Sequence, residues 1–342
     1  DALAAEGMEL REHIRTLSVM GLVEVLKHYR YFKRIFTALE TEVRSNPPDL
    51  ILLIDYPGFN LRFAKAVRDL HIPTVQYICP QVWAWKQSRI PKMARILDRL
   101  LCIFPFEPPL FSPVNLPAFY CGHPLVEETL ETVADPDWQV EGPKLALLPG
   151  SRQQEIDRLF LPMLLTAARL QTAHPALQVR VAAATRELQT HMEALANTAA
   201  PDCRISFSTG KTRALVKGAD AALVTSGTAT LETALLGIPM LVVYKTSALT
   251  YAIGKRIVKV KHIGMVNLVA EEEICPEFLQ ERASPDLLAP ALSALLQESP
   301  QRQQMLTALQ AIRGRLTGDG GGERPAELIL ELLQTNVGKS PA

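Results

Sequence analysis

The hydrophobic positions in the first third of the chain form short runs separated by amphipathic stretches. Apolar runs at 49–55 and 74–80 each follow proline, and the residues between them have helical spacing. This order predicts a strand–helix–strand unit and therefore a parallel sheet. Two further apolar runs, 99–106 and 117–124, predict two more strands.

The same alternation returns after a polar, turn-rich stretch at 131–144, which we interpret as an interdomain linker. Helical spacing is found at 156–172 and 187–199, and from 284 to the end, where glycine-rich residues 318–325 interrupt it. The predicted strands of this second series are 144–148, 178–184, 204–209, 221–226 and 239–245.

The pattern predicts an α/β protein with two doubly wound, Rossmann-like domains. We expect them at 1–135 and 144–315, with a C-terminal helix at 323–342. Two such domains face each other across a cleft, and ligands bind where the carboxyl ends of the strands meet it.

Composition narrows the possible functions. The 342 residues suit two domains, and the hydrophobic fraction of 48% suits packed cores. Lys and Arg number 36, as do Asp and Glu, so no overall field attracts nucleic acid. The five cysteines lack C-x-x-C or zinc-site spacing, which favours a reducing cytoplasm. No apolar run reaches about 18 residues, so we expect no membrane span.

A basic amphipathic helix is predicted at 21–39. Lys and Arg crowd one side of it, which is typical of helices that lie on a membrane surface. A core-facing helix with a solvated basic face would show the same pattern. The residues that would face the membrane are Leu22, Val25, Leu26, Phe32 and Phe36.

Two strand–turn–helix junctions resemble phosphate-binding loops. The first places Gly150, Ser151 and Arg152 between a strand and a helix, where free N–H groups and a guanidinium attract phosphate. The alternative is an ordinary turn with a solvated Arg152.

The second junction carries Ser226, Gly227 and Thr228, followed by Glu232 one turn into the helix. Its hydroxyls suit a pyrophosphate, and Glu232 could bridge the two hydroxyls of a ribose. The alternative is a simple helix cap with a solvated carboxylate. Together the two junctions predict a site for a nucleoside diphosphate.

Other candidates lie in the first series. Asp55 ends a buried strand beside the expected cleft, where a carboxylate can act as a general base, although a turn residue would fit as well. We expect Trp83 and Trp85 to serve in packing. Asp135 and Asp137 form a D-x-D pair, but in the linker, so we predict no metal site there.

Expected motifs of other enzyme classes are missing. No G-x-G-x-x-G follows a strand, Gly210-Lys211-Thr212 lacks the earlier glycine of a P-loop, and no G-x-S-x-G occurs. These absences disfavour dinucleotide-dependent dehydrogenases, P-loop enzymes and α/β-hydrolases.

Eight strings, in this order along the chain, resemble the lipid-A-disaccharide synthase family. They are SVMGLVEVL (18–26), IDYPGFN (54–60), PQVWAW (80–85), FPFE (104–107), GHPLVE (122–127), LALLPGSR (145–152), SGTATLE (226–232) and NLVA (267–270). The combination of WAW with PGSR and SGTATLE is specific, and the strings extend over nearly the whole chain.

The resemblance implies a GT-B glycosyltransferase without cofactor or metal, which acts on the inner face of the bacterial inner membrane. It would join UDP-2,3-diacylglucosamine to 2,3-diacylglucosamine 1-phosphate, with inversion, in lipid A (lipopolysaccharide) biosynthesis. The acceptor would bind in domain 1–135 and the UDP-sugar in domain 144–315. Asp55 matches the proposed base of the family, and Arg152, Glu232 and Asn267 match donor-site positions. A homo-oligomer is compatible with this reading.

The resemblance also raises one expectation about the start of the chain. Family members open with a strand and a G-E-x-S-G-D loop, which this sequence does not contain, so we expect an incomplete first domain and doubtful activity. The alternatives are a UDP-N-acetylglucosamine 2-epimerase, the N-acetylglucosaminyltransferase of peptidoglycan assembly, and a non-catalytic, membrane-bound UDP-sugar binder.

Overall fold

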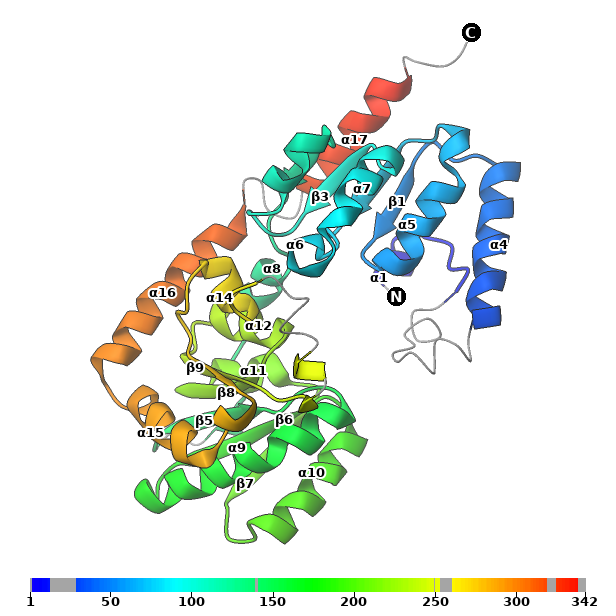
Figure 1. Ribbon diagram of the computed structural model, residues 1–342. Helices are drawn as coiled ribbons and strands as arrows, with labels where there is room; N and C mark the ends of the chain where they lie inside the picture. Colours follow the sequence, from blue (N-terminus) through cyan, green and yellow to red (C-terminus); the bar gives the residue numbers. More distant parts are fainter. Residues whose placement is uncertain are drawn as a thin grey trace.

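A computed structural model of the chain describes residues 2–12, 29–138, 141–248, 250–252, 260–318 and 324–337. Two parallel sheets, each covered by helices, lie at opposite ends of an elongated molecule (Figure 1). The predicted α/β architecture with two doubly wound domains is confirmed.

The first sheet has four parallel strands in the order β1-β2-β3-β4. One face packs against helices in a core that contains Leu53, Phe63, Met93 and Phe111. The strands are β1 (Ile51–Ile54), β2 (Thr74–Tyr77), β3 (Arg99–Cys102) and β4 (Ala118–Tyr120). The helices that precede or connect them are α1 (Ala2–Ala5), α4 (Tyr29–Ser45), α5 (Pro57–Ala66), η1 (Arg68–Leu70), α6 (Val82–Trp85), η2 (Gln87–Arg89), α7 (Ile90–Ile96) and η3 (Pro108–Val114).

The second sheet has six parallel strands in the order β10-β9-β8-β5-β6-β7. The chain runs outward from β5 to β7, then returns to β8 on the other side of β5, so the topological switch point lies between β5 and β8. The strands are β5 (Lys144–Leu148), β6 (Gln178–Ala183), β7 (Ile205–Thr209), β8 (Ala221–Thr225), β9 (Met240–Tyr244) and β10 (Glu277–Leu279). Strand β10 was not predicted, because its three residues follow no clear apolar run.

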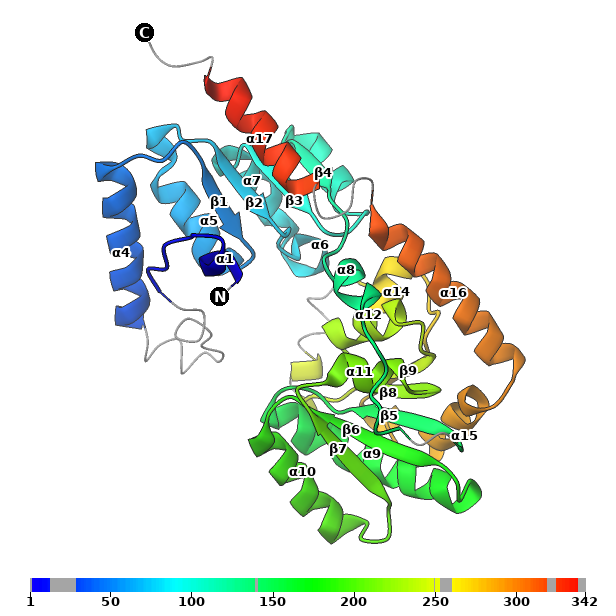
Figure 2. The same ribbon diagram turned by 180° about the vertical axis from the view of Figure 1, so that it is seen from behind.

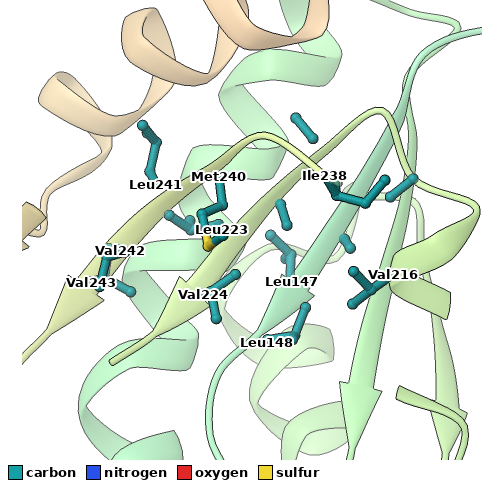
Figure 3. Close-up of a cluster of buried hydrophobic side chains, with 14 of the residues drawn as sticks. Leu147, Leu148, Val216, Leu223, Val224, Ile238, Met240, Leu241, Val242 and Val243 are labelled. Atoms are coloured by element: carbon teal, nitrogen blue, oxygen red, sulfur yellow. The ribbon is translucent and has the colours of Figure 1, made fainter. Parts of the chain in front are cut away.

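Helices cover both faces of this second sheet (Figure 1). Helix α9 contacts α10 and α15, whereas α12 contacts α11, α14 and α16. The strand residues between them are almost free of solvent contact, and Leu147, Leu223, Val224 and Val242 lie together at the centre of this core (Figure 3). The helices are α8 (Leu125–Leu130), α9 (Gln153–Ala173), α10 (Arg186–Ala199), α11 (Thr212–Lys217), α12 (Thr228–Leu235), α14 (Met265–Ala270), η4 (Gln280–Arg282), α15 (Pro285–Leu296) and α16 (Pro300–Thr317).

The last helix, α17 (Arg324–Val337), returns to the first sheet (Figure 2). Its Leu328 is 1% exposed and packs on Val75 and Leu101, which point to the sheet face opposite the first core. Helix α17 does not cover the edge strand β1, whose Leu52 and Ile54 are 41% and 43% exposed on the same face of the sheet. The C-terminal helix is therefore part of the first domain's packing.

The segment that we interpreted as a linker is anchored to the second domain. Trp138 is buried against Gly218, and its indole N–H donates to the carbonyl of Leu215 at 2.9 Å. Asp135 is also buried, and it forms an ion pair with Arg180 of β6 at 3.1 Å. The first domain therefore ends before Asp135, because these contacts fix residues 135–138 to the second sheet.

The chain passes between the two domains at one joint. After β4, the N–H of His123 donates to the carbonyl of Leu316, near the end of α16, at 2.9 Å. A Cβ on Gly122, whose φ is +79°, would lie 2.6 Å from the carbonyl oxygen of Thr317. Only glycine fits this close approach.

Candidate functional site

A pocket of about 660 Å³ lies between the two domains. The first domain contributes Asp55 and the segment from Ile78 to Arg89, and the second contributes Gly227, Thr228 and Met265. The pocket is bounded by residues that follow β1, β2 and β8, as expected for a doubly wound sheet. Of the predicted site residues, Asp55, Gly227 and Thr228 come together here.

Asp55 follows β1 directly, and its backbone is fixed from two sides. The side-chain amide of Asn60 donates to the carbonyls of Ile54 and Asp55 at 3.0 and 2.7 Å. The amide of the buried Gln76 donates to the same Asp55 carbonyl at 3.1 Å. The Asp55 side chain is exposed and reaches the pocket. These contacts fix the backbone of Asp55 and so place its exposed side chain at the rim of the pocket.

Three residues at this end of the sheet adopt left-handed backbone conformations. The φ angles are +46° at Asp55, +42° at Tyr56 and +70° at Ile78. For a β-branched residue such as Ile78 this conformation is a clear outlier. Strain of about 1–3 kcal/mol per residue persists where the surrounding structure enforces it, which is common at functional sites.

Glu107 lies below the pocket and has no exposed surface. Its carboxylate accepts one hydrogen bond from the indole N–H of Trp83 and one from the N–H of Phe104, both at 3.1 Å. Burial raises the pKa of Glu107 to about 7, although these two hydrogen bonds oppose the shift. The carboxylate thus connects the segment after β2 to the one after β3. The packing role predicted for Trp83 agrees with this contact.

Cys79 and Cys102 lie next to Glu107. Within the described part of the chain, these three residues offer metal-ligating atoms within 4.8 Å of one another. Both carboxylate oxygens of Glu107 already accept hydrogen bonds, and all three residues are buried. We therefore interpret the group as packing beneath the pocket.

His123 lines the pocket from the joint between the domains. Burial lowers its pKa to about 4, so the imidazole is neutral at physiological pH. Its Nδ1 accepts a hydrogen bond from the N–H of Leu125 at 3.2 Å, which leaves the proton on Nε2. The ring can therefore donate one hydrogen bond.

The first predicted phosphate loop, Gly150 to Arg152, follows β5 and precedes α9. Its N–H groups are not free: the Glu155 carboxylate accepts from the N–H of Ser151 at 3.0 Å and of Arg152 at 3.2 Å. The Arg152 guanidinium also pairs with Glu155 at 3.3 Å, and its side chain is 60% exposed. The loop lies outside the pocket lining, beside the switch point of the second sheet.

The second predicted loop is divided between two roles. The hydroxyl of Ser226 donates to the carbonyl of Ile263 at 2.9 Å, so it fixes the neighbouring segment. Gly227 and Thr228 are exposed in the pocket, and α12 begins at Thr228. The first N–H groups of a helix have no partner within it and attract anions.

Comparisons with known proteins bear on this geometry. Residues 1–317 match the family model described as lipid-A-disaccharide synthetase. The curated lipid-A-disaccharide synthase of Geobacter metallireducens is 35% identical over 341 residues, which cover 97% of this chain and 87% of that protein. The one of Trichlorobacter lovleyi is 38% identical over 333 residues, covering 93% and 84%.

The chain belongs to the lipid-A-disaccharide synthase family.

Solved structures share the fold at low sequence identity. A UDP-N-acetylglucosamine 2-epimerase from Neisseria meningitidis, bound to UDP-N-acetylglucosamine, superposes with a TM-score of 0.58 at 11% identity, covering 92% of this chain and 82% of that one. A trehalose 6-phosphate synthase from Burkholderia multivorans gives 0.55 at 13%, covering 95% and 80%. These neighbours have different activities, so they establish the GT-B fold of this synthase-family chain and not its reaction.

In addition to Arg152, two further donor-site residues expected from the family lie outside the pocket lining. Asn267 is fully buried, and its amide bonds with the backbone N–H and carbonyl of Cys275 and with the Glu277 carboxylate. These partners occupy both ends of the amide, so Asn267 positions the segment before β10, and a direct donor contact by Asn267 stays a prediction.

Glu232 faces Arg213 at 3.5 Å, and Arg213 also pairs with Glu128 of α8. Burial raises the pKa of Glu232, while Arg213 opposes the shift. A ribose contact by Glu232 stays a prediction.

Both carboxylates of the D-x-D pair, Asp135 and Asp137, face Arg180, at 3.1 and 3.2 Å, so a cation occupies the position that a metal would need.

The predicted membrane-facing residues separate into three groups. Leu22, Val25 and Leu26 lie outside the described residues. Phe32 is half-buried on α4. Phe36 is not membrane-facing: it packs edge-on against Phe59 and Phe63 of α5, at 5.5 and 5.7 Å, because this turn of α4 faces the first core. None of the described helices is long and apolar enough to cross a bilayer.

Sequence reasoning did not single out four residues that shape the pocket: Gln76, Lys86, Arg89 and His123. Gln76 and His123 are isolated polar residues in or after strands, and their side chains bond to backbone groups, which leave no signal in the sequence. The strings PQVWAW and GHPLVE lie in or next to the segments that line the pocket, but neither string indicates which hydrogen bonds its residues form.

Proposed function

We propose that this chain transfers the sugar of UDP-2,3-diacylglucosamine to 2,3-diacylglucosamine 1-phosphate and releases UDP. Membership of the synthase family supports the reaction class. The observation that carries the mechanism is the pocket that brings Asp55 of the first domain opposite Gly227 and Thr228 of the second. One wall offers a base for the acceptor, and the other offers a helix terminus for the leaving group.

Asp55 acts as the general base. Its carboxylate takes the proton from the 6-hydroxyl of the acceptor as that oxygen bonds to the anomeric carbon of the donor. The bond from that carbon to UDP breaks on the opposite side, so the configuration inverts and a β-1,6 linkage forms. A positioned base contributes about 10²–10⁴ in rate.

The leaving diphosphate is stabilised on the second domain. Helix α12 begins at Thr228 in the pocket, so the positive end of its dipole faces developing negative charge. Arg152 stands at the neighbouring β5 loop and can exchange its contact with Glu155 for the diphosphate. Fixed positive groups of this kind take the place of a divalent metal.

The protein acts at a membrane surface, because both substrates carry acyl chains. Arg30, Lys33 and Arg34 are exposed on α4 and line a shallow depression there. Such a basic surface attracts anionic headgroups. Leu22, Val25, Leu26 and Phe32 would supply the apolar contact, and we place the protein at the inner face of the inner membrane.

A product assay with both substrates tests the mechanism. The Asp55→Asn variant should lose about 10²-fold or more in turnover, while calorimetry should find its UDP affinity unchanged. Asp49→Asn, at the opposite end of β1, is the matched control and should behave as wild type. Turnover of Asp55→Asn within a few-fold of wild type would reduce Asp55 to a turn residue.

The same assay tests the metal-free reaction. Turnover should persist in excess EDTA, because the cationic groups of the chain meet the leaving UDP. Loss of turnover in EDTA that Mg²⁺ restores would contradict this account.

A further inference from the structure

Two cations in the pocket have no part in the mechanism above. Lys86 follows α6 directly, and Arg89 ends η2. Both are half-buried and line the pocket together with Asp55. The Lys86 ammonium lies 3.8 Å from the ring centre of Trp85, and the Arg89 guanidinium carbon lies 6.0 Å from the same centre. The Trp85 indole therefore holds both positive groups close together on the first-domain side of the pocket.

Neither cation has an acidic partner in the part of the chain that the structure describes, unlike several arginines elsewhere in the protein. Arg68 pairs with Asp98, Arg180 with Asp135, and Arg213 with Glu128 and Glu232. Within the described residues, no carboxylate forms an ion pair with Lys86 or Arg89, and Asp55 is the one carboxylate in the pocket lining. The first-domain wall thus carries two positive charges that no ion pair neutralises, which suits an anionic ligand such as a phosphate.

The position of these two cations indicates which anionic group of the two substrates they would bind. This step rests on the proposed function. The donor's diphosphate leaves toward the second domain, where α12 and the loop of Gly150 lie. The acceptor carries the hydroxyl that Asp55 deprotonates and, one hexose ring away, a phosphate monoester. Lys86 and Arg89 lie on the same domain as Asp55, so they meet the acceptor side.

We propose that Lys86 and Arg89 form the subsite for the phosphate monoester of the acceptor sugar. The guanidinium fork of Arg89 can bind two phosphate oxygens, and the Lys86 ammonium supplies a point charge to the third. The subsite fixes the acceptor ring at the end opposite its reacting hydroxyl. It thereby selects a phosphorylated acceptor over the same diacylated sugar without phosphate.

A binding experiment on the whole chain tests this subsite without the need for turnover. The probes are 2,3-diacylglucosamine 1-phosphate and its dephosphorylated counterpart in the same neutral detergent micelles, with Trp fluorescence as readout. Wild type should bind the phosphorylated sugar at least about tenfold more tightly, and Lys86→Gln/Arg89→Gln should bind the two equally. Lys92→Gln, an exposed cation on α7 outside the pocket, should keep the preference.

Calorimetry with UDP provides the second measurement, and unchanged affinity in the double variant is expected because the donor binds elsewhere. A tenfold loss of UDP affinity would assign the two cations to the donor diphosphate and overturn the proposal. A wild type without preference, or a double variant that keeps it, would also overturn it. A protein that shows the preference yet forms no disaccharide would contradict the proposed reaction while supporting the subsite.

Discussion

At the scale of single residues, the pocket depends on groups that would be unfavourable elsewhere. Glu107 is a carboxyl group in an apolar interior, and Asp55, Tyr56 and Ile78 hold left-handed conformations. Each of these features lowers the free energy of unfolding, and each belongs to a segment that lines or supports the pocket. The backbone N–H groups of Asp55 and Ile78 donate to neighbouring strands, and Glu107 accepts from Trp83 and Phe104. Contacts made in the folded state therefore offset the cost.

Glu107 should make the stability of the protein pH-dependent. Its pKa rises from 4.5 in the unfolded chain to about 7 in the folded state, so the folded state holds the proton more tightly. This contribution is complete below pH 4.5 and is lost as the pH rises to about 7. The free energy of unfolding of wild type should therefore fall by about 3 kcal/mol between pH 4.5 and 7 on account of this group. In Glu107→Gln, which cannot ionise, this fall should be absent. Urea unfolding at several pH values measures the difference, and parallel profiles would show that Glu107 does not titrate there.

Arg152 should contribute to donor affinity if it turns from Glu155 to the diphosphate. Arg152→Ala removes charge-assisted hydrogen bonds, so UDP binding should weaken by about 2 kcal/mol. Arg158→Ala, further along the same helix, is the control and should bind UDP normally. Calorimetry that finds equal UDP affinity in both variants would exclude Arg152 from the site.

At the scale of elements, most of the fold could be predicted because parallel strands are continuous apolar runs. Nine of the ten strands described here coincide with such runs, and β10 does not. The partners of side chains could not be predicted. Asn267 and Phe36 sit in segments with the expected pattern, yet the first is enclosed by Cys275 and Glu277, and the second by α5. Which side of an amphipathic helix meets the core depends on what packs beside it.

Helix α4 should carry the electrostatic part of membrane attachment. Replacing Arg30, Lys33 and Arg34 with Gln should reduce partitioning onto vesicles with anionic lipid, because each exposed cation near such a surface contributes about 1 kcal/mol. A control variant loses the same charge from the second domain, at the exposed Arg186, Lys211 and Lys217. Vesicle sedimentation should separate the two variants, and equal retention would remove α4 from the membrane contact.

At the scale of the whole molecule, the first domain is completed by the far end of the chain. Helix α17 covers Val75 and Leu101, and the Arg99 guanidinium donates to the carbonyl of Leu328. Residues more than 200 positions apart thus share one core. The stability of the first sheet therefore depends on α17.

Two leucines of α17 make this dependence measurable. Leu328→Ala should lower the free energy of unfolding by about 2–4 kcal/mol, because Leu328 is 1% exposed and its loss leaves a cavity. Leu330→Ala, on the same helix but 56% exposed, should change it by less than about 0.5 kcal/mol. Equal effects in urea unfolding would mean that α17 does not pack as described.

The joint where Gly122 meets Thr317 has a mechanical consequence. Both passages of the chain between the domains run through one point, held by the His123–Leu316 hydrogen bond. Ile103 and Phe104, which follow β3, also pack in the buried cluster of the second domain, so a rotation about this joint would have to disrupt apolar contacts. His123 at this joint and Asp55 of the first domain both line the pocket, so a change at the joint would reach the pocket directly.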